Sequence, residues 1–124
     1  MSEKIPALRT VAMPADTNPA GDIFGGWLLS QMDIAGGTHA YQEVRQRVVT
    51  VAIDAITFHL PVKVGDEVSC YCETVHRGNT SIGIYIETWV RRRLSPDEKK
   101  VTEGKFIYVA VDEDGKPQPW EKQE

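Results

Sequence analysis

Apolar and polar positions repeat along this chain in two different periods, which predict one helix among several strands. Leu8 to Met13 is expected to form a short strand, and Pro14 to Gly21 a loop rich in proline, asparagine and glycine. The helical period runs from Ile23 to about Val44, with Asp22 as a candidate N-cap. One face of this segment carries apolar residues at helical spacing: Phe24, Leu28, Met32 and Ala35.

Four longer strands are predicted after the helix. They are rich in β-branched residues and separated by turn or loop signals: Val48 to Leu60, Glu67 to Arg77, Thr80 to Arg93 and Val101 to Val111. The polar tail from Lys116 to Glu124 is expected to be poorly ordered. The order strand, helix, four antiparallel strands indicates an α+β protein whose sheet wraps around a single helix.

Composition and charge narrow the class of protein. A length of 124 residues favours one domain over residues 1–124, with a core from about 8 to 117. The chain has 14 Lys+Arg against 18 Asp+Glu, which argues against a basic domain held on nucleic acid by bulk charge. No apolar run approaches the ~20 residues of a membrane span, and the first ten residues lack the apolar core of a secretory signal. Cys70 and Cys72 suit neither a disulfide nor a zinc site, so a reduced cytoplasmic compartment is expected.

Asp33 is the only formally charged residue between Ile23 and Gln42. A helix that is apolar or small nearly all round is expected to be buried, and a buried aspartate is rare unless it is paired or functional. Its helical neighbours are small: Gly26, Ser30, Gly36 and Gly37. They leave room for another subunit or a ligand at Asp33. The alternative, in which Asp33 only bonds a neighbouring strand amide, stays open.

Gly25 and Gly26 mark the start of the predicted helix. The first N–H groups of a helix lack internal partners and lie at the positive end of its dipole. Glycine would let a substrate oxygen approach them, as in an oxyanion hole. The same glycines also suit a tight turn with close packing, so both interpretations remain.

The stretch AMPADTNPAGDIFGGWLLSQMD, Ala12 to Asp33, resembles the signature of hotdog-fold acyl-CoA thioesterases of the YciA type, which are related to mammalian cytosolic acyl-CoA hydrolases. The similarity continues through Arg47 to Tyr71, Gly78 to Val90 and Tyr108 to Pro117. It implies a hotdog fold, in which an antiparallel sheet wraps one central helix and is paired into a dimer. It further implies a trimer of such homodimers, a hexamer.

The resemblance implies hydrolysis of acyl-CoA to a free carboxylic acid and coenzyme A, with no further cofactor. Asp33 would be the general base or nucleophile, and Asn18 would face the partner subunit's Asp33. Gly25 and Gly26 would form the oxyanion site. The resemblance also makes Thr80 and Ser81 candidates for contact with the pantetheine arm.

The densest basic cluster of the chain supplies the candidates for the coenzyme phosphates: Arg91, Arg92 and Lys99, with their basic neighbours. A net acidic protein needs such a local patch to bind a polyphosphate. Arg91 and Arg92 should point to opposite faces of a strand, so both cannot contact one ligand in the same way. A solvated charged rim is the alternative for each residue.

Other functions are weaker on the sequence. A non-catalytic acyl-CoA sensor would not need Asp33 and Asn18, and a hotdog dehydratase would need a histidine in the loop Pro14 to Gly21, which has none. A Ser30 nucleophile lacks the strained G-x-S-x-G turn. A purely structural oligomer would explain neither Asp33 nor its glycines. The three histidines are expected to be structural: His39, His59 and His76.

Overall fold

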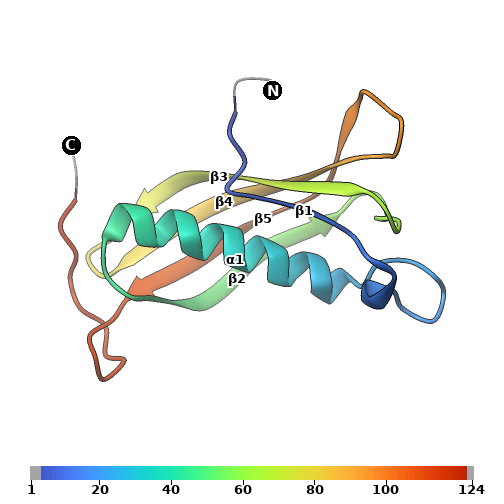
Figure 1. Cartoon of the computed structure of the whole chain (residues 1–124). Helices are drawn as coiled ribbons and strands as arrows, with labels where there is room; N and C mark the ends of the chain where they lie inside the picture. Colours follow the sequence, from blue (N-terminus) through green and yellow to red (C-terminus); the bar gives the residue numbers. More distant parts are fainter. Residues whose placement is uncertain (1–3, 123–124) are drawn as a thin grey trace.

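The computed structural model describes residues 4–122, and within them one α-helix lies across one face of a five-stranded antiparallel sheet (Figure 1). The strands lie in the order β1-β3-β4-β5-β2. The bounds are β1 (Leu8–Val11), α1 (Gly25–Val44), β2 (Val48–Phe58), β3 (Glu67–Arg77), β4 (Ser81–Arg91) and β5 (Glu98–Ala110). A short 3-10 helix, Pro14–Asp16, precedes α1. The predicted hotdog arrangement is therefore confirmed.

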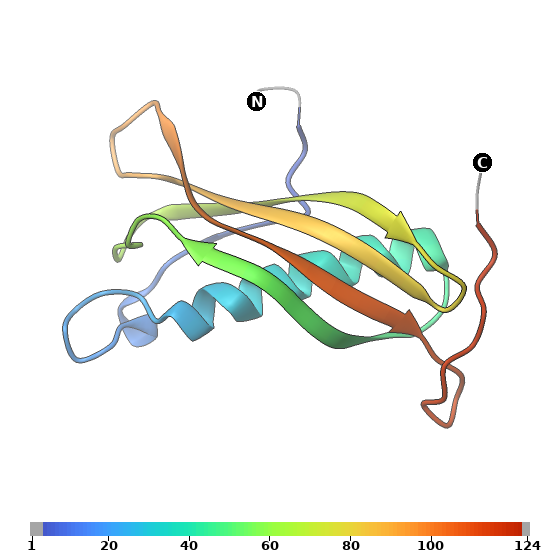
Figure 2. The same cartoon turned by 180° about the vertical axis from the view of Figure 1, so that it is seen from behind.

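The sheet is built from two long hairpins with a strand added at each edge. β3, β4 and β5 pair along most of their lengths, while β2 crosses over to pair with β5 and the short β1 pairs with β3 (Figure 2). The predicted β3 is confirmed residue for residue, and the other strands within a few residues. β5 begins earlier than predicted, at Glu98, because this residue pairs with Arg91 of β4.

The start of α1 differs from the prediction. The helix begins at Gly25 and its N-cap is Phe24, which makes no side-chain capping bond. Asp22 is therefore not the cap. Its carboxylate instead accepts a hydrogen bond of 2.6 Å from Lys63 Nζ, in the connection between β2 and β3.

Only one face of α1 is buried within the chain. Its buried residues pack against the inner faces of β3, β4 and β5: Leu28, Met32, Ala35, Gly36, Ala40 and Val44. On the opposite face Ile34 is 55% and Tyr41 58% exposed. The prediction of a helix buried all round is therefore wrong for a single chain. β2, at the edge of the sheet, is also mostly exposed, including Val51 and Ile53.

The C-terminal tail is better packed than predicted. Val111 and Pro117 form an isolated bridge, and the ring of Trp120 is only 4% exposed. Trp120 Nε1 donates a 3.0 Å hydrogen bond to the main-chain oxygen of Ser81. The prediction of poor order is thus wrong as far as residue 122. The last two residues of the predicted tail, and the first three of the segment that was searched for a secretory signal, lie outside the described residues.

Two further expectations concern the cellular compartment: the lack of a membrane span and the free state of the two cysteines. Across residues 4–122, no helix combines the length and apolar character needed to cross a membrane. Cys70 is buried and Cys72 half-buried, and both are free thiols.

Candidate active site

The Asp33 carboxylate is held by two hydroxyl groups from the sheet. Its Oδ1 accepts a 2.7 Å hydrogen bond from Thr50 Oγ1 of β2 and a 3.1 Å bond from the Tyr108 hydroxyl of β5. The same Tyr108 hydroxyl lies 3.0 Å from the main-chain oxygen of Asp33. Among residues 4–122, nothing donates a hydrogen bond to Oδ2. The carboxylate is thus fixed at one oxygen and open at the other, and it bonds side chains rather than a strand amide.

Gly36 provides the space in which the Tyr108 hydroxyl approaches Asp33. A Cβ atom at position 36 would lie 2.3 Å from the Tyr108 hydroxyl oxygen and 2.7 Å from Ile86 Cδ1. The sequence predicted that the glycines beside Asp33 admit another subunit or a ligand. At Gly36 the approaching group belongs to the same chain, so that interpretation is corrected there. At Gly37 a Cβ would make only an ordinary contact of 3.7 Å with Tyr108.

Tyr108 and Thr50 were missed by the sequence analysis as parts of the site. A signal for Tyr108 exists: it lies on the inward face of β5 with Phe106 and Ala110, and a buried tyrosine hydroxyl needs a partner. Burial, followed by the charge of Asp33 and the hydrogen bond to it, raises the pKa of Tyr108 far above its ordinary value. Tyr108 therefore stays a neutral hydrogen-bond donor.

The helix start lies well away from Asp33 of the same chain. Gly25 and Gly26 occupy the first turn of α1, and neither N–H donates to an acceptor in the described part of the chain. A Cβ at Gly26 would meet nothing within 4 Å, so the space there is open. Asp33 follows eight residues after Gly25, about 12 Å along the helix axis. No single substrate carbonyl can contact both places within one chain.

An apolar groove lies beside the helix start. It has a volume of about 340 Å³, and its walls include Leu28, Phe58 and Leu60 next to Gly25. The Phe58 ring would lie 3.4 Å from a Cβ at Gly25. The first N–H groups of α1 therefore border an apolar surface.

Asn18 organises the loop that leads into α1. Its side-chain Oδ1 accepts hydrogen bonds from the main-chain N–H groups of Ala20 (3.0 Å) and Asp22 (3.1 Å). Its own N–H donates to the main-chain oxygen of Asp22 at 2.7 Å. Asn18 makes no hydrogen bond to Asp33 of the same chain, and its side-chain NH₂ group donates to no acceptor within residues 4–122. Its contact with the partner subunit's Asp33 stays a prediction.

Arg91 and Arg92 both form ion pairs inside the chain. Arg91 lies 3.4 Å from Glu67 and 3.7 Å from Glu98. Arg92 Nε donates a 2.9 Å bond to Asp66, whose side chain is buried. These contacts tie the ends of β3 and β5 to the end of β4, so both arginines have a structural task whatever else they bind.

The remaining predicted coenzyme residues lie at two ends of the sheet. Thr80 and Ser81 form the hairpin between β3 and β4, against which Trp120 packs. Lys99 is exposed near the other end, beside Arg91, and has no ion-pair partner in residues 4–122. β4 from Ser81 to Arg91 spans about 33 Å. The structure therefore does not bring these two groups together within one chain.

Ser30 and two of the histidines take part in structural contacts. The Ser30 hydroxyl donates to a main-chain oxygen of its own helix at 2.8 Å. His39 lies 3.0 Å from the Thr74 hydroxyl, and His59 lies 2.8 Å from Glu103. Among the hydrogen bonds of residues 4–122, none therefore joins Ser30 to a histidine.

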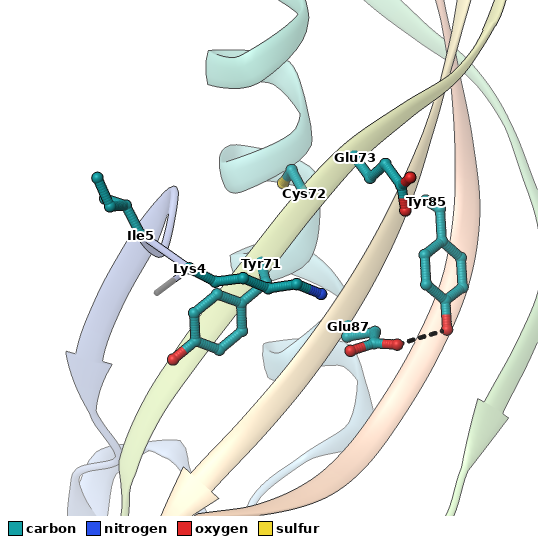
Figure 3. A pocket seen from close by; sticks show the side chains of 7 residues that line it. All are labelled: Lys4, Ile5, Tyr71, Cys72, Glu73, Tyr85 and Glu87. Carbon is teal, nitrogen blue, oxygen red and sulfur yellow. Dashed lines mark hydrogen bonds between the residues drawn. The ribbon is translucent and has the colours of Figure 1, made fainter. Parts of the chain in front are cut away.

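A separate hollow of about 350 Å³ lies on the outer face of the sheet, away from α1 (Figure 3). Its aromatic and acidic side chains come from β3 and β4, and Tyr85 donates a 3.0 Å bond to Glu87 there. Cys72 also borders it, and burial with the neighbouring Cys70 thiol raises the pKa of Cys72 to about 12. None of the predicted site residues lines this hollow.

One long helix across one face of an antiparallel sheet is the arrangement of the hotdog fold. Residues 20–94 match the family model described as the thioesterase superfamily. The acyl-CoA thioester hydrolase YciA of Salmonella typhimurium is 58% identical over 115 residues, which are 90% of this chain and 86% of that protein. The YciA enzyme of Escherichia coli is 55% identical over 113 residues, 89% of this chain and 86% of that one.

Two solved structures of similar sequence have the same fold. A hexameric thioesterase from Yersinia pestis superposes with a TM-score of 0.91 at 49% identity, covering 98% of this chain and 99% of that chain. A hexameric hotdog-fold thioesterase of Campylobacter jejuni gives 0.88 at 46% identity, with coverage of 94% and 90%. The chain therefore belongs to the thioesterase superfamily and, within it, to the YciA acyl-CoA thioester hydrolases.

Proposed function

We propose that the chain hydrolyses acyl-CoA thioesters with Asp33 as the reacting carboxylate. The observation that carries this is the carboxylate itself, with Oδ1 bound by Thr50 and Tyr108 and Oδ2 left open. As a general base, Asp33 takes a proton from water while the water oxygen attacks the thioester carbonyl carbon. The carbon–sulfur bond then breaks, and the proton passes to the leaving thiolate of coenzyme A. As a nucleophile, Asp33 would attack the carbonyl carbon first and expel coenzyme A as its thiolate, which leaves a mixed anhydride. Water would then hydrolyse the anhydride to the free acid and the Asp33 carboxylate, and the proton that this step releases would pass to the thiolate.

A complete site on this proposal combines two chains. Gly25 and Gly26 offer free N–H groups for the developing oxyanion, but they lie about 12 Å along α1 from their own Asp33. The proposal therefore pairs Asp33 of one chain with Gly25, Gly26 and Asn18 of another. The apolar groove beside Gly25 would take the acyl chain.

The exposed β2 edge and the open face of α1 support a homodimer. Both leave apolar side chains in water, and the β2 edge also leaves unpaired main-chain groups there. The hexameric structures of the Yersinia pestis and Campylobacter jejuni thioesterases support further assembly, which we propose to be a trimer of dimers. We also place the protein in the cytoplasm, where free thiols such as Cys70 and Cys72 persist.

The coenzyme would then lie along surfaces from more than one chain. Thr80 and Ser81 remain the candidates for the pantetheine arm, and Arg91, Arg92 and Lys99 for the phosphates. Since these groups lie at opposite ends of β4, two subunits bring them together most simply. Of these three basic residues, Arg91 and Arg92 form ion pairs, and Lys99 forms none in the described chain. No cofactor is required beyond the coenzyme A of the substrate.

The test is thiol release from a panel of acyl-CoA chain lengths by the wild type and by Asp33→Asn. This substitution is nearly isosteric, so folding and assembly should persist while kcat falls by about 10² or more. Glu73→Gln is the matched control, because Glu73 is an exposed carboxylate at the outer hollow. Near wild-type kcat in folded Asp33→Asn would remove Asp33 from the mechanism. Binding of acyl-CoA by the wild type without thiol release would instead indicate the alternative function, a non-catalytic acyl-CoA sensor.

A further inference from the structure

Tyr108 is buried between α1 and the sheet, and its hydroxyl hydrogen bonds only to Asp33 among residues 4–122. Its side chain is 1% exposed, and its oxygen lies 3.1 Å from Oδ1 and 3.0 Å from the main-chain oxygen of Asp33. A tyrosine placed only for packing would need neither contact, since phenylalanine would fill nearly the same volume. The hydroxyl therefore needs a separate explanation.

The helix departs from good helix-forming sequence to admit this hydroxyl. Gly36 is a poor helix former at a buried position, where alanine would normally pack. Its missing Cβ would stand 2.3 Å from the Tyr108 oxygen, which is closer than any real contact of this kind. Gly36 and Tyr108 thus form a matched pair, one clearing the space that the other fills.

The contact between Gly36 and Tyr108 determines how the carboxylate of Asp33 is oriented. Thr50 and Tyr108 both bind Oδ1, so the carboxylate plane is fixed and Oδ2 remains without a partner in the described chain. We propose that Tyr108 is a positioning residue, which orients Asp33 so that Oδ2 is the oxygen that takes the proton or attacks the thioester. This inference rests on the proposed function, because it concerns the same carboxylate.

The surroundings keep this arrangement in one charge state. Burial and the nearby carboxylate raise the pKa of Tyr108, and the Cys72 thiol on β3 is held neutral by a pKa of about 12. The contact from β2 is the hydroxyl of Thr50, which does not titrate. Asp33 is then the carboxylate of this cluster, and both of the hydroxyl groups that bond its Oδ1 stay neutral.

The first experiment compares Tyr108→Phe with the wild type across pH. Removing one donor to a charged group should lower kcat about ten-fold and leave KM for acyl-CoA unchanged, because the substrate does not contact the hydroxyl. The acid limb of the kcat profile should move to higher pH, because a hydrogen bond that favours the charged carboxylate is lost. Tyr85→Phe is the matched control: its hydroxyl also bonds carboxylates, but on the outer face, and neither quantity should change.

The second experiment separates positioning from packing. In an Asp33→Asn background, Tyr108→Phe should cause little further loss, because the carboxylate that it orients is already gone. If the kcat losses of the two substitutions multiply in the double variant, the inference is overturned, since Tyr108 would then act independently of Asp33. Gly36→Ala should reproduce the Tyr108→Phe profile by displacing the hydroxyl, and it replaces that variant if Tyr108→Phe does not assemble.

The outcomes distinguish the inference from the proposed function. A wild type that releases no thiol from any acyl-CoA overturns both. If the wild type does release thiol and Asp33→Asn is inactive, but Tyr108→Phe is unchanged in kcat and pH profile, only the role of Tyr108 is overturned. Loss of activity in Tyr108→Phe together with an unchanged acid limb and a raised KM would also overturn it.

Discussion

At the scale of single residues, the two faces of the sheet hold their carboxylates in different ways. On the inner face, both side-chain hydrogen bonds to Asp33 go to Oδ1, and Oδ2 has no partner within residues 4–122. On the outer face Glu103 accepts hydrogen bonds from Tyr85 (2.6 Å), Lys100 (2.9 Å) and His59 (2.8 Å), so both of its oxygens are used. The first arrangement suits chemistry and the second suits stability.

We predict that Glu103 contributes stability that is lost in acid. Its hydrogen bonds, first that from Tyr85 and then those from Lys100 and His59, lower its pKa from 4.5 to about 2. A carboxylate with a lowered pKa stabilises the fold above its unfolded pKa, and this contribution disappears as pH falls from 4.5 toward 2. The wild type should therefore melt at a higher temperature than Glu103→Gln at pH 7, and the difference should shrink over that range.

The control for this experiment is Glu73→Gln, which removes an exposed outer-face carboxylate. Its melting temperature should follow that of the wild type at every pH. Parallel curves for Glu103→Gln and the wild type between pH 7 and pH 2 would contradict the role assigned to Glu103.

At the scale of elements, the sequence predicted what local patterns encode. The strands followed from runs of β-branched residues between turn signals, and the helix from its apolar period, so most bounds agree within a few residues. Asp33 stood out because it is the only formally charged residue between Ile23 and Gln42. Its partner Tyr108 could not be found in this way, because the two are 75 residues apart and only the pairing of the strands brings them together.

The C-terminal tail is a second case in which long-range contacts were not predictable from the sequence. Its polar composition predicted poor order, but composition does not tell where a single aromatic residue will pack. Trp120 is buried against the hairpin between β3 and β4, and Lys122 lies 4.2 Å from the centre of its ring. Contacts with residues far away in the sequence, including the burial of Trp120, therefore order a segment whose composition does not predict it.

We predict that Trp120 anchors this segment and stabilises the fold. Trp120→Ala should lower the free energy of unfolding by about 3 kcal/mol, the lower end for removing a buried tryptophan. Denaturant unfolding at fixed protein concentration measures this change. Lys122→Ala keeps the buried ring but removes the cation over it and the hydrogen bonds of that ammonium group to the main chain, so it should cost less, about 1 kcal/mol. Equal stability of Trp120→Ala and the wild type would show that the tail packs without stabilising the chain.

At the scale of the whole molecule, the proposed function requires that one chain holds halves of two different sites. Its Asp33 lies mid-helix, while its Gly25 and Gly26 lie about 10–12 Å away along the axis at the helix entrance, and Asn18 lies in the loop before them. A two-fold related copy can bring the entrance of one chain to the carboxylate of the other. Complementation between inactive chains tests this directly.

We predict that mixing Asn18→Ala subunits with Asp33→Asn subunits restores activity. Each mixed dimer contains one site with both natural residues and one site with neither. Random exchange of equal amounts should therefore recover about a quarter of the wild-type activity. The measurement is thiol release after subunit exchange, with mixed dimers verified by mass. Verified mixed dimers without activity would mean that the two residues act within one chain or that Asn18 only shapes its loop.

The sheet has two very unequal edges. β2 offers eleven residues, whereas β1 at the other edge has four and carries Arg9. When two copies join through β2, the long edges are consumed and the new outer edges are short and bear a charge, which makes them poor templates for another strand. If the proposed dimer forms through β2, this joining ends after one step, and the short β1 edges then protect the dimer from growing into a fibre.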